Sequence, residues 1–388
     1  MRVILVITSL SLCFTLTTYQ WLTNERHERK YHHPVLVKGR YGFIDNKGKL
    51  LFSLPQEVIN VRDFSEGLAV VGSKLGERHT GWGYIDVSGK VVIQPKYERA
   101  RSFSGGLAAV RQDGKWGFIN QSGELIISFS FDLEDNEEIR FSEGLAVVRY
   151  ASPPDPKYRG KYGYIDQSGN LAIGPQFSSA SPFSEGLAII SIERIDRRPK
   201  RGYIDKEGEV IIQPQFTVAK DFSEGLAMVQ VGEYGTAKVG YIDKTGKLVI
   251  APQFDSVYDV IKTPNDVSKP LRYYRSGRER DFSEGMAAVK INEKWGYINK
   301  LGQIVIPTQF VYAGQFKEGL AAVALRKGNK RVYGFINKSG QFTVQPKYDD
   351  VKEFKHGLAA VFFTDSQGDI DAWGYIDKMG RYVWKPTK

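Results

Sequence analysis

The acidic side chains that could perform acid–base chemistry are copied along the sequence instead of forming one unique pair. Glutamate occupies the same place in six copies of a Phe-x-Glu-Gly segment: Glu66, Glu143, Glu185, Glu224, Glu284 and Glu318. General acid–base catalysis needs particular groups at one reacting centre. A residue copied into most units of an array is better explained by a function within each unit. We therefore predict no catalytic residue and expect the protein not to be an enzyme.

Metal and cofactor sites are not indicated either. Three of the five histidines (His27, His32 and His33) lie in one charged N-terminal stretch, and His356 replaces the repeated glutamate in the last Phe-x-Glu-Gly segment. A second repeated turn begins with Asp or Asn. Calcium would need roughly six to eight converging oxygens, and the free exchange of Asp for Asn argues against that use. Phosphate loops, dinucleotide fingerprints and nucleophile elbows are absent as convincing motifs, so we predict neither metal nor cofactor.

The strongest pattern is a tandem repeat of two motifs. The segment aromatic-Gly-aromatic-Ile-Asp/Asn-x-x-Gly recurs nine times, beginning at Tyr41, Trp82, Trp116, Tyr162, Arg201, Val239, Trp295, Tyr333 and Trp373, two of which are not aromatic. Phe-Ser-Glu-Gly-Leu-Ala, or a close variant, follows every copy except the last. Two motifs in fixed order at a period of about 40 residues indicate a repeat architecture.

Each unit is predicted to be a three-stranded antiparallel meander. In residues 103–150, the apolar run 107–110 predicts a first strand and Asp113-Gly114 a tight turn. Residues 115–120 then form the second strand, and 125–127 the third. The fold class is therefore all-β, with eight to nine such meanders in tandem.

The middle strand of each unit is expected to be buried on both faces. By the strand period of two, Trp116 and Phe118 share one face, while Gly117 and Ile119 share the other. Such sheets must stack on one another to cover their apolar surfaces. We expect each glycine to allow close approach of an adjacent sheet or ring. The residues assigned to this core are Trp82, Trp116, Trp295 and Trp373, with Gly83, Gly117, Gly163, Gly202, Gly240, Gly296, Gly334 and Gly374.

Stacked sheets can close into a ring or stay open. A propeller-like radial array is favoured over an open β-solenoid, because units of this length normally form propeller blades. One feature argues against simple closure: the chain begins with two strands (41–52) that lack a preceding Leu-Ala strand, yet it ends with all three. A blade shared between the two ends would need complementary fragments.

The two motifs resemble those of the WG-repeat family of bacterial proteins. The resemblance covers nearly everything from Tyr41 to Pro386 and rests on Gly-Tyr/Phe-Ile-Asp/Asn-x-x-Gly, Ile/Val-x-Pro-x-Tyr/Phe and Phe-Ser-Glu-Gly-Leu-Ala. Only four copies carry the tryptophan itself, and the copies with Arg201 and Val239 should be the weakest units. The resemblance implies a repeat scaffold and does not imply one chemistry.

The N-terminus predicts export. Residues 1–22 contain one basic residue, Arg2, and an apolar run, which is typical of a signal peptide. No small-residue cleavage site precedes Asn24, so an uncleaved membrane anchor is the alternative. The only cysteine, Cys13, lies in this leader, and the body therefore depends on packing alone. We assign 23–40 to a solvated spacer and 41–388 to the repeat domain of a periplasmic, cell-surface or secreted protein, with membrane contact only through the leader.

The longest insertion is the candidate binding surface. The net charge is +10, but the basic residues are dispersed, which disfavours nucleic acid as a partner. The insertion between Asp255 and Asp281 interleaves cations with aromatic rings, a combination that can grip an anionic polymer. Its candidate residues, beside Lys269, are Arg272, Tyr273, Tyr274, Arg275, Arg278 and Arg280. The alternative is a solvated loop without a ligand.

Three functions are compatible with this sequence. The leading hypothesis is a non-enzymatic, extracytoplasmic scaffold that binds a protein or an anionic or polysaccharide envelope polymer through insertions and exposed aromatic residues. The second is a hydrolase or lyase of envelope polymers, which would require two unrepeated carboxylates facing one cleft. The third is a structural spacer, which would show no affinity.

Overall fold

The computed structural model describes residues 31–76, 79–132, 139–149, 160–192, 199–232, 236–256, 280–365 and 368–387. Within these ranges all regular secondary structure is β, and no helix there has the length and apolar character needed to cross a bilayer. The predicted leader (1–22) and most of the long insertion (257–279) lie outside the described residues.

The described strands form nine antiparallel sheets, each from consecutive strands. Blade 1 contains β1 (His33–Val37), β2 (Arg40–Ile44) and β3 (Leu50–Ser53); blade 2 contains β4 (Val58–Ser65), β5 (Leu68–Leu75), β6 (His79–Asp86) and β7 (Val91–Tyr97); blade 3 contains β8 (Arg99–Ala100), β9 (Ala108–Gln112), β10 (Lys115–Ile119) and β11 (Leu125–Phe131). Blade 4 contains β12 (Phe141–Ser142), β13 (Leu145–Arg149), β14 (Tyr162–Ile165) and β15 (Leu171–Phe177); blade 5 contains β16 (Ser179–Ala180), β17 (Ala188–Ser191), β18 (Arg201–Ile204) and β19 (Val210–Phe216); blade 6 contains β20 (Val218–Ala219), β21 (Ala227–Val231), β22 (Lys238–Ile242) and β23 (Leu248–Phe254). Blade 7 contains β24 (Met286–Ile291), β25 (Lys294–Asn299) and β26 (Ile304–Phe310); blade 8 contains β27 (Tyr312–Lys317), β28 (Leu320–Lys327), β29 (Lys330–Asn337) and β30 (Phe342–Tyr348); blade 9 contains β31 (Asp350–Val351), β32 (Leu358–Thr364), β33 (Ile370–Asp377) and β34 (Tyr382–Thr387).

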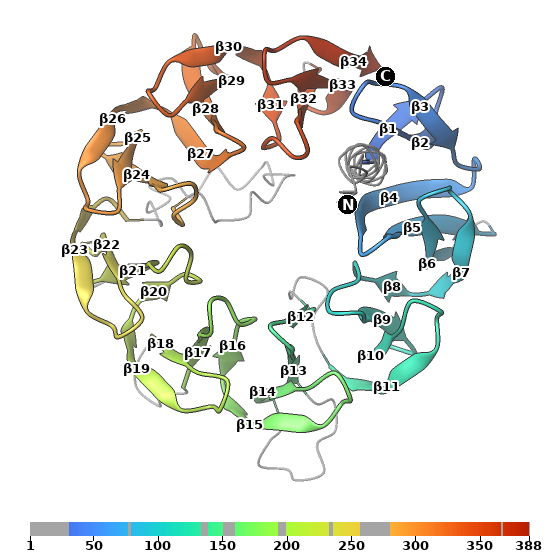
Figure 1. The fold of residues 1–388 in the computed structure, drawn as a ribbon, viewed down its shortest axis with the longest axis horizontal. Coiled ribbons are helices and arrows are strands. Elements are labelled where there is room, and N and C mark those ends of the chain that lie inside the picture. The colour runs from blue at the N-terminus through green and yellow to red at the C-terminus, as the bar shows by residue number, and fades with distance from the viewer. Residues whose placement is uncertain are drawn as a thin grey trace, which may run out of the picture.

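The sheets surround one centre, and the first and last blades are neighbours (Figure 1). The architecture is a nine-bladed β-propeller, which confirms the radial array over the open solenoid. The predicted three strands per unit are wrong for most blades: seven of the nine described sheets have four strands. The additional inner strand is often only two residues long, as in β8 and β16, so it carries no alternating pattern that sequence could display.

The third strand of each full blade carries the aromatic-Gly motif and contributes buried residues to both faces. Of the four predicted core tryptophans, Trp116 is buried, whereas Trp82, Trp295 and Trp373 are partly buried. In blade 3, Trp116 and Phe118 pack toward blade 4, and Ile119 packs toward blade 2. We call this strand the aromatic strand in every blade, and the strand after it the outer strand. Burial on both faces explains why the centre of the strand, Trp116 to Ile119 in blade 3, carries no charged residue; Lys115 lies at its start.

The repeated glycine of the aromatic strand does not face a neighbouring sheet, contrary to expectation. The register between the aromatic and outer strands shifts at this point in blades 2 to 9. A Cβ atom added to Gly163 would lie 2.6 Å from the carbonyl oxygen of Ile173 and 2.9 Å from the nitrogen of Pro175, both in its own sheet. Glycine is required because the bulged outer strand crosses directly over it.

The ring closes by packing of blade 1 against blade 9, without a shared strand. Val35 and Ile44 of blade 1 lie in one apolar cluster with Leu358, Ala360 and Tyr375 of blade 9. The boundary predicted at residue 41 is wrong in the described part, because β1 pairs with β2 from His33 onward. The spacer thus supplies the strand that the first repeat lacks, and simple closure becomes possible.

Candidate binding surfaces

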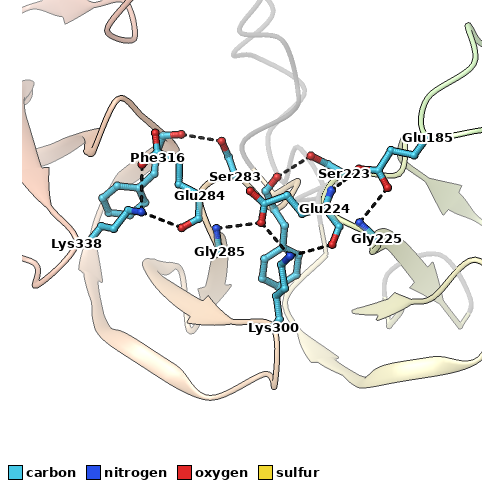
Figure 2. A network of polar contacts seen from close by, with 11 residues as sticks. Glu185, Ser223, Glu224, Gly225, Ser283, Glu284, Gly285, Lys300, Phe316 and Lys338 are labelled. Carbon is cyan, nitrogen blue, oxygen red and sulfur yellow. Dashed lines mark hydrogen bonds and ion pairs between the residues drawn. The ribbon is translucent and has the colours of Figure 1, made fainter. Parts of the chain in front are cut away.

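The repeated Phe-Ser-Glu-Gly turns link each blade to the next. We call the side of the ring that carries these turns, together with the Asp/Asn-x-x-Gly turns, the turn face. Glu224 of blade 6 accepts a hydrogen bond from the amide of Gly285 in blade 7 at 3.0 Å, and Ser223 Oγ donates to the carbonyl of Phe282 at 2.7 Å. Figure 2 shows two successive links of this kind. Glu66, Glu143, Glu185, Glu284 and Glu318 accept amide hydrogen bonds from the following blade in the same way. The copied glutamates are therefore structural.

Lysine completes the link in the later blades. Lys300 of blade 7 lies 3.2 Å from the Glu224 carboxylate and donates to the carbonyl of the same residue at 3.0 Å. Burial raises the pKa of Glu224, but the hydrogen bonds from Lys300 and from the Gly285 amide outweigh it, and the pKa lies below its usual value. The equivalent pairs are Lys206–Glu143, Lys244–Glu185, Lys338–Glu284 and Lys378–Glu318.

We expect Glu224→Gln to reduce the acid sensitivity of the fold. A carboxylate with a lowered folded-state pKa stabilises the protein above its unfolded pKa, near 4.5, and this contribution is lost as pH falls through the folded pKa. Between pH 6 and pH 3.5, the free energy of unfolding should therefore fall less in the variant than in the wild type. Because the pair is partly exposed, the difference should stay below about 1 kcal/mol. Denaturant unfolding at several pH values measures it.

Glu207→Gln is the matched control, because Glu207 is an exposed residue of the same face. It should leave the acid sensitivity unchanged. Equal pH profiles for the wild type and Glu224→Gln would contradict the structural role of these links.

Two of the eight turns lack the glutamate: Gly105 replaces it in blade 3 and His356 in blade 9. Blade 1 has no Phe-Ser-Glu-Gly turn, so His356 of blade 9 has no following turn amide to accept, and glutamate is not required there. The position that carries lysine in blades 5 to 9 holds Val87 in blade 2, which is 49% exposed. In blades 3 and 4 it holds Gln121 and Gln167, which donate to the carbonyls of Glu66 and Gly105. The glutamate link is thus interrupted at two places, at blade 1 and between blades 3 and 4, where the serine link from Ser104 to the carbonyl of Phe141 remains.

The longest insertions enter and leave the ring on the opposite side, which we call the loop face. The aromatic strand of each blade begins at this face. The strand registers Arg149↔Tyr162↔Phe177 and Ser191↔Arg201↔Phe216 place the two shorter insertions there. Val239↔Phe254 places the start of the Asp255–Asp281 insertion at the same side. One face therefore presents all three.

An arginine fixes the base of each insertion. Arg149 donates to the carbonyl of Asp132, Arg201 to that of Thr217, and Arg280 to that of Asp255. Each acceptor is the first residue after an outer strand. The insertions therefore leave the ring from fixed points.

Among the six predicted binding residues, Arg280 lies in the described part of the chain and is buried. Its side chain is 3% exposed and lies 4.7 Å from the centre of the Trp295 ring, so its role is structural. The predicted binding residues Arg272, Tyr273, Tyr274, Arg275 and Arg278 lie outside the described residues, and their assignment stays a prediction. Among the described residues, no group of three or more His, Cys, Asp or Glu side chains could hold a metal ion.

Two carboxylates, Asp63 and Glu353, line one cavity between blades 9, 1 and 2. Both occupy the position before the motif phenylalanine, which is also acidic at Asp221 and Asp281. Asp63 is moreover paired with Lys355 at 2.6 Å. These carboxylates are copies of a repeat position, and this favours binding over hydrolysis at the cavity.

Comparison with protein families identifies the repeat. The model of the family described as "WG containing repeat" matches residues 82–116, 116–151, 162–193, 202–234, 240–262, 280–295, 295–330 and 333–363. These segments cover more than half of the chain. A comparison with curated proteins found no match.

Solved structures similar to this chain include two of low sequence identity. TolB from Acinetobacter baumannii is 14% identical to this chain, with a TM-score of 0.29. The match covers 60% of this chain and 65% of TolB, which is less than two thirds of the TolB chain. The β-propeller domain of the Trilobed protease from Pyrococcus furiosus, described as having an open velcro topology, is 9% identical. Its TM-score is 0.40 over 85% of this chain and 94% of that domain.

Proposed function

The chain belongs to the WG-repeat family, and from this premise and the geometry of the ring we propose that it is a non-enzymatic scaffold working outside the cytoplasm. Its partner is a protein or an anionic or polysaccharide polymer of the cell envelope. The partner binds at the loop face, where the insertions are attached.

The observation that carries this proposal is the common attachment of the insertions. Three arginines bind three equivalent carbonyl groups and hold the insertion ends on one side of a rigid ring. Binding residues are commonly carried on loops that a rigid scaffold positions. Fixed loop ends also reduce the conformational entropy lost on binding.

Export is the second part of the proposal and rests on the apolar run in residues 1–22. Fractionation of cells producing the full chain with a C-terminal tag should place the protein in the envelope or medium. Recovery only with the cytoplasmic fraction would contradict export and leave the binding proposal to be tested separately.

Replacing Arg272, Arg275 and Arg278 together with serine should weaken capture of an anionic envelope partner. The reason is loss of charge–charge attraction, which is strongest at low salt. The measurement is quantitative co-purification of envelope components with the tagged full chain, at two salt concentrations. Heparin serves as a defined anionic probe in parallel.

The matched control is Arg280→Ser. This variant removes the hydrogen bond to the Asp255 carbonyl and the contact with Trp295, so it should lower the melting temperature. The triple variant should melt as the wild type does. Unchanged capture by the triple variant would show that the long insertion does not recognise the partner.

A further inference from the structure

A cavity of 370 Å³ lies at the inner edge of blade 1, which has no inner strand among the described residues. Its wall on the blade 9 side contains Leu358, Ala360 and Tyr375, and the opposite wall includes Pro34 of β1 and Val61 of β4. In blade 2, the equivalent positions of Leu358 and Ala360 are Leu68 and Val70. Those residues pack against Ala100 and Phe103, which belong to the inner segment of blade 3. The cavity therefore lies at the position of one such segment, which no described residue occupies; we call it the vacated position.

Phenylalanine fills this position at the other eight junctions. In each, the Phe of the turn motif packs on the second aromatic residue of the preceding aromatic strand, with ring centroids 4.7 to 5.1 Å apart. At the junction of blades 9 and 1, Tyr375 instead meets the smaller ring of His33 at 5.3 Å. Histidine covers the tyrosine only in part, and the cavity remains beside it.

A small aliphatic residue accompanies the phenylalanine. Three residues before six of the eight motif phenylalanines, the sequence carries Ala or Val, and before the other two it carries Glu138 and Glu279: the six are Val61, Ala100, Ala180, Ala219, Ala313 and Val351. Of these, Ala100, Ala219, Ala313 and Val351 are less than 9% exposed. The segment at these six junctions is thus an extended peptide of the form Ala/Val-x-x-Phe.

The hydrogen bonds at the cavity also match an incoming segment. In blade 3, the amide of Arg101 donates to the carbonyl of Ala109, while Tyr84 of blade 2 donates its hydroxyl to the carbonyl of Arg101. At the vacated position, Tyr375 donates directly to the carbonyl of Pro34, which is the equivalent of Ala109. The carbonyl of an inserted backbone would accept the hydrogen bond from the Tyr375 hydroxyl, and its amide would donate to the carbonyl of Pro34.

We propose that this cavity, the seam site, binds an extended segment of a partner protein with the pattern Ala/Val-x-x-Phe. This inference rests on the proposed scaffold function and names the chemistry of one partner. The phenylalanine lies on Tyr375 and the aliphatic residue lies against Ala360. Lys355 and Asp63 form an ion pair of 2.6 Å across the edge of the cavity, and both side chains are more than half exposed. This pair borders the bound backbone.

The protein's own inner segment provides the probe. A fluorescent peptide with the sequence of residues 218–225, Val-Ala-Lys-Asp-Phe-Ser-Glu-Gly, should bind the full chain saturably in an anisotropy titration. A peptide with alanine in place of its phenylalanine should bind at least tenfold more weakly. Equal affinities for the two peptides, or no saturable binding by either, would overturn the proposal.

Ala360→Leu tests the place of binding. Its side chain would enter the cavity, so the melting temperature should stay equal or rise, and peptide affinity should fall at least tenfold. Ala322→Leu is the matched variant at the equivalent position of blade 8, where Phe354 already fills the junction; it should lower the melting temperature. Unchanged peptide affinity in folded Ala360→Leu would place the peptide elsewhere and overturn the seam site.

Failure of this inference is distinguishable from failure of the scaffold function. If the peptide does not bind, while the full chain still captures an envelope partner that Ala360→Leu captures equally, the seam site is wrong and the scaffold stands. The opposite outcome is that the peptide binds the wild type but not Ala360→Leu, while the triple arginine variant captures the envelope partner as well as the wild type does. In that case binding at the loop face is wrong and the seam site stands.

Discussion

Trp116→Ala should lower the free energy of unfolding by about 3–5 kcal/mol, the range for truncation of a buried aromatic residue. Trp116 is 0% exposed and packs between blades 3 and 4. Arg101 lies over its ring at 5.1 Å and would lose that contact as well. Because the ring is closed, each blade is held from two sides, and the loss should appear in one cooperative transition. Denaturant unfolding followed by circular dichroism gives both quantities.

Trp373→Ala is the control for this prediction. Trp373 is only half-buried and lines the seam site, so its truncation should cost less than that of Trp116. A loss below about 1 kcal/mol for Trp116→Ala would contradict the core assignment. Two separated transitions would contradict the closed ring, because an open array unfolds in neighbouring groups.

Gly163→Ala should destabilise blade 4 by about 1–3 kcal/mol or more, the range for overpacking a filled interior. Its new methyl group would lie 2.6 Å from the Ile173 carbonyl oxygen. That neighbour is backbone in a hydrogen-bonded sheet and cannot rotate away. The measurement is the same denaturant unfolding.

Gly174→Ala, in the adjacent outer strand of the same blade, is the matched control. A Cβ atom there meets nothing within 4 Å. This variant should be neutral or slightly stabilising, since alanine reduces the entropy of the unfolded chain. Similar losses for the two variants would show that the bulged strand is not the reason for glycine.

The sequence predicted the parts of the fold that depend on local pattern. The aromatic strands and their turns were predicted because alternation and turn residues act within a few positions. The two-residue inner strands were missed. Their only signal is a small residue three positions before the motif phenylalanine, such as Ala100 before Phe103. That signal becomes meaningful once the opposing blade is known.

The candidate sites could be predicted only in part, because they depend on contacts between distant residues. Arg280 is close in sequence to other arginines, but its buried position depends on Asp255 and Trp295. The seam site is formed by blade 9 together with blades 1 and 2. Two of its residues, Lys355 and Asp63, are more than 290 positions apart in the sequence. His356 stood out in the sequence as an exception to the turn motif, and it lies at that junction near His33.

Site-specific crosslinking tests the central claim, binding at the loop face, most directly. Cys13, the only native cysteine, is first replaced by serine. A single cysteine is then introduced at one of two exposed positions in blade 7. These are Lys294 on the loop face, at the start of β25, and Leu301 on the turn face, in the turn that follows this strand. Each cysteine then receives a photoactivatable crosslinker in envelope preparations. The account predicts partner adducts from position 294 and few from position 301. Adducts from position 301 alone would contradict it.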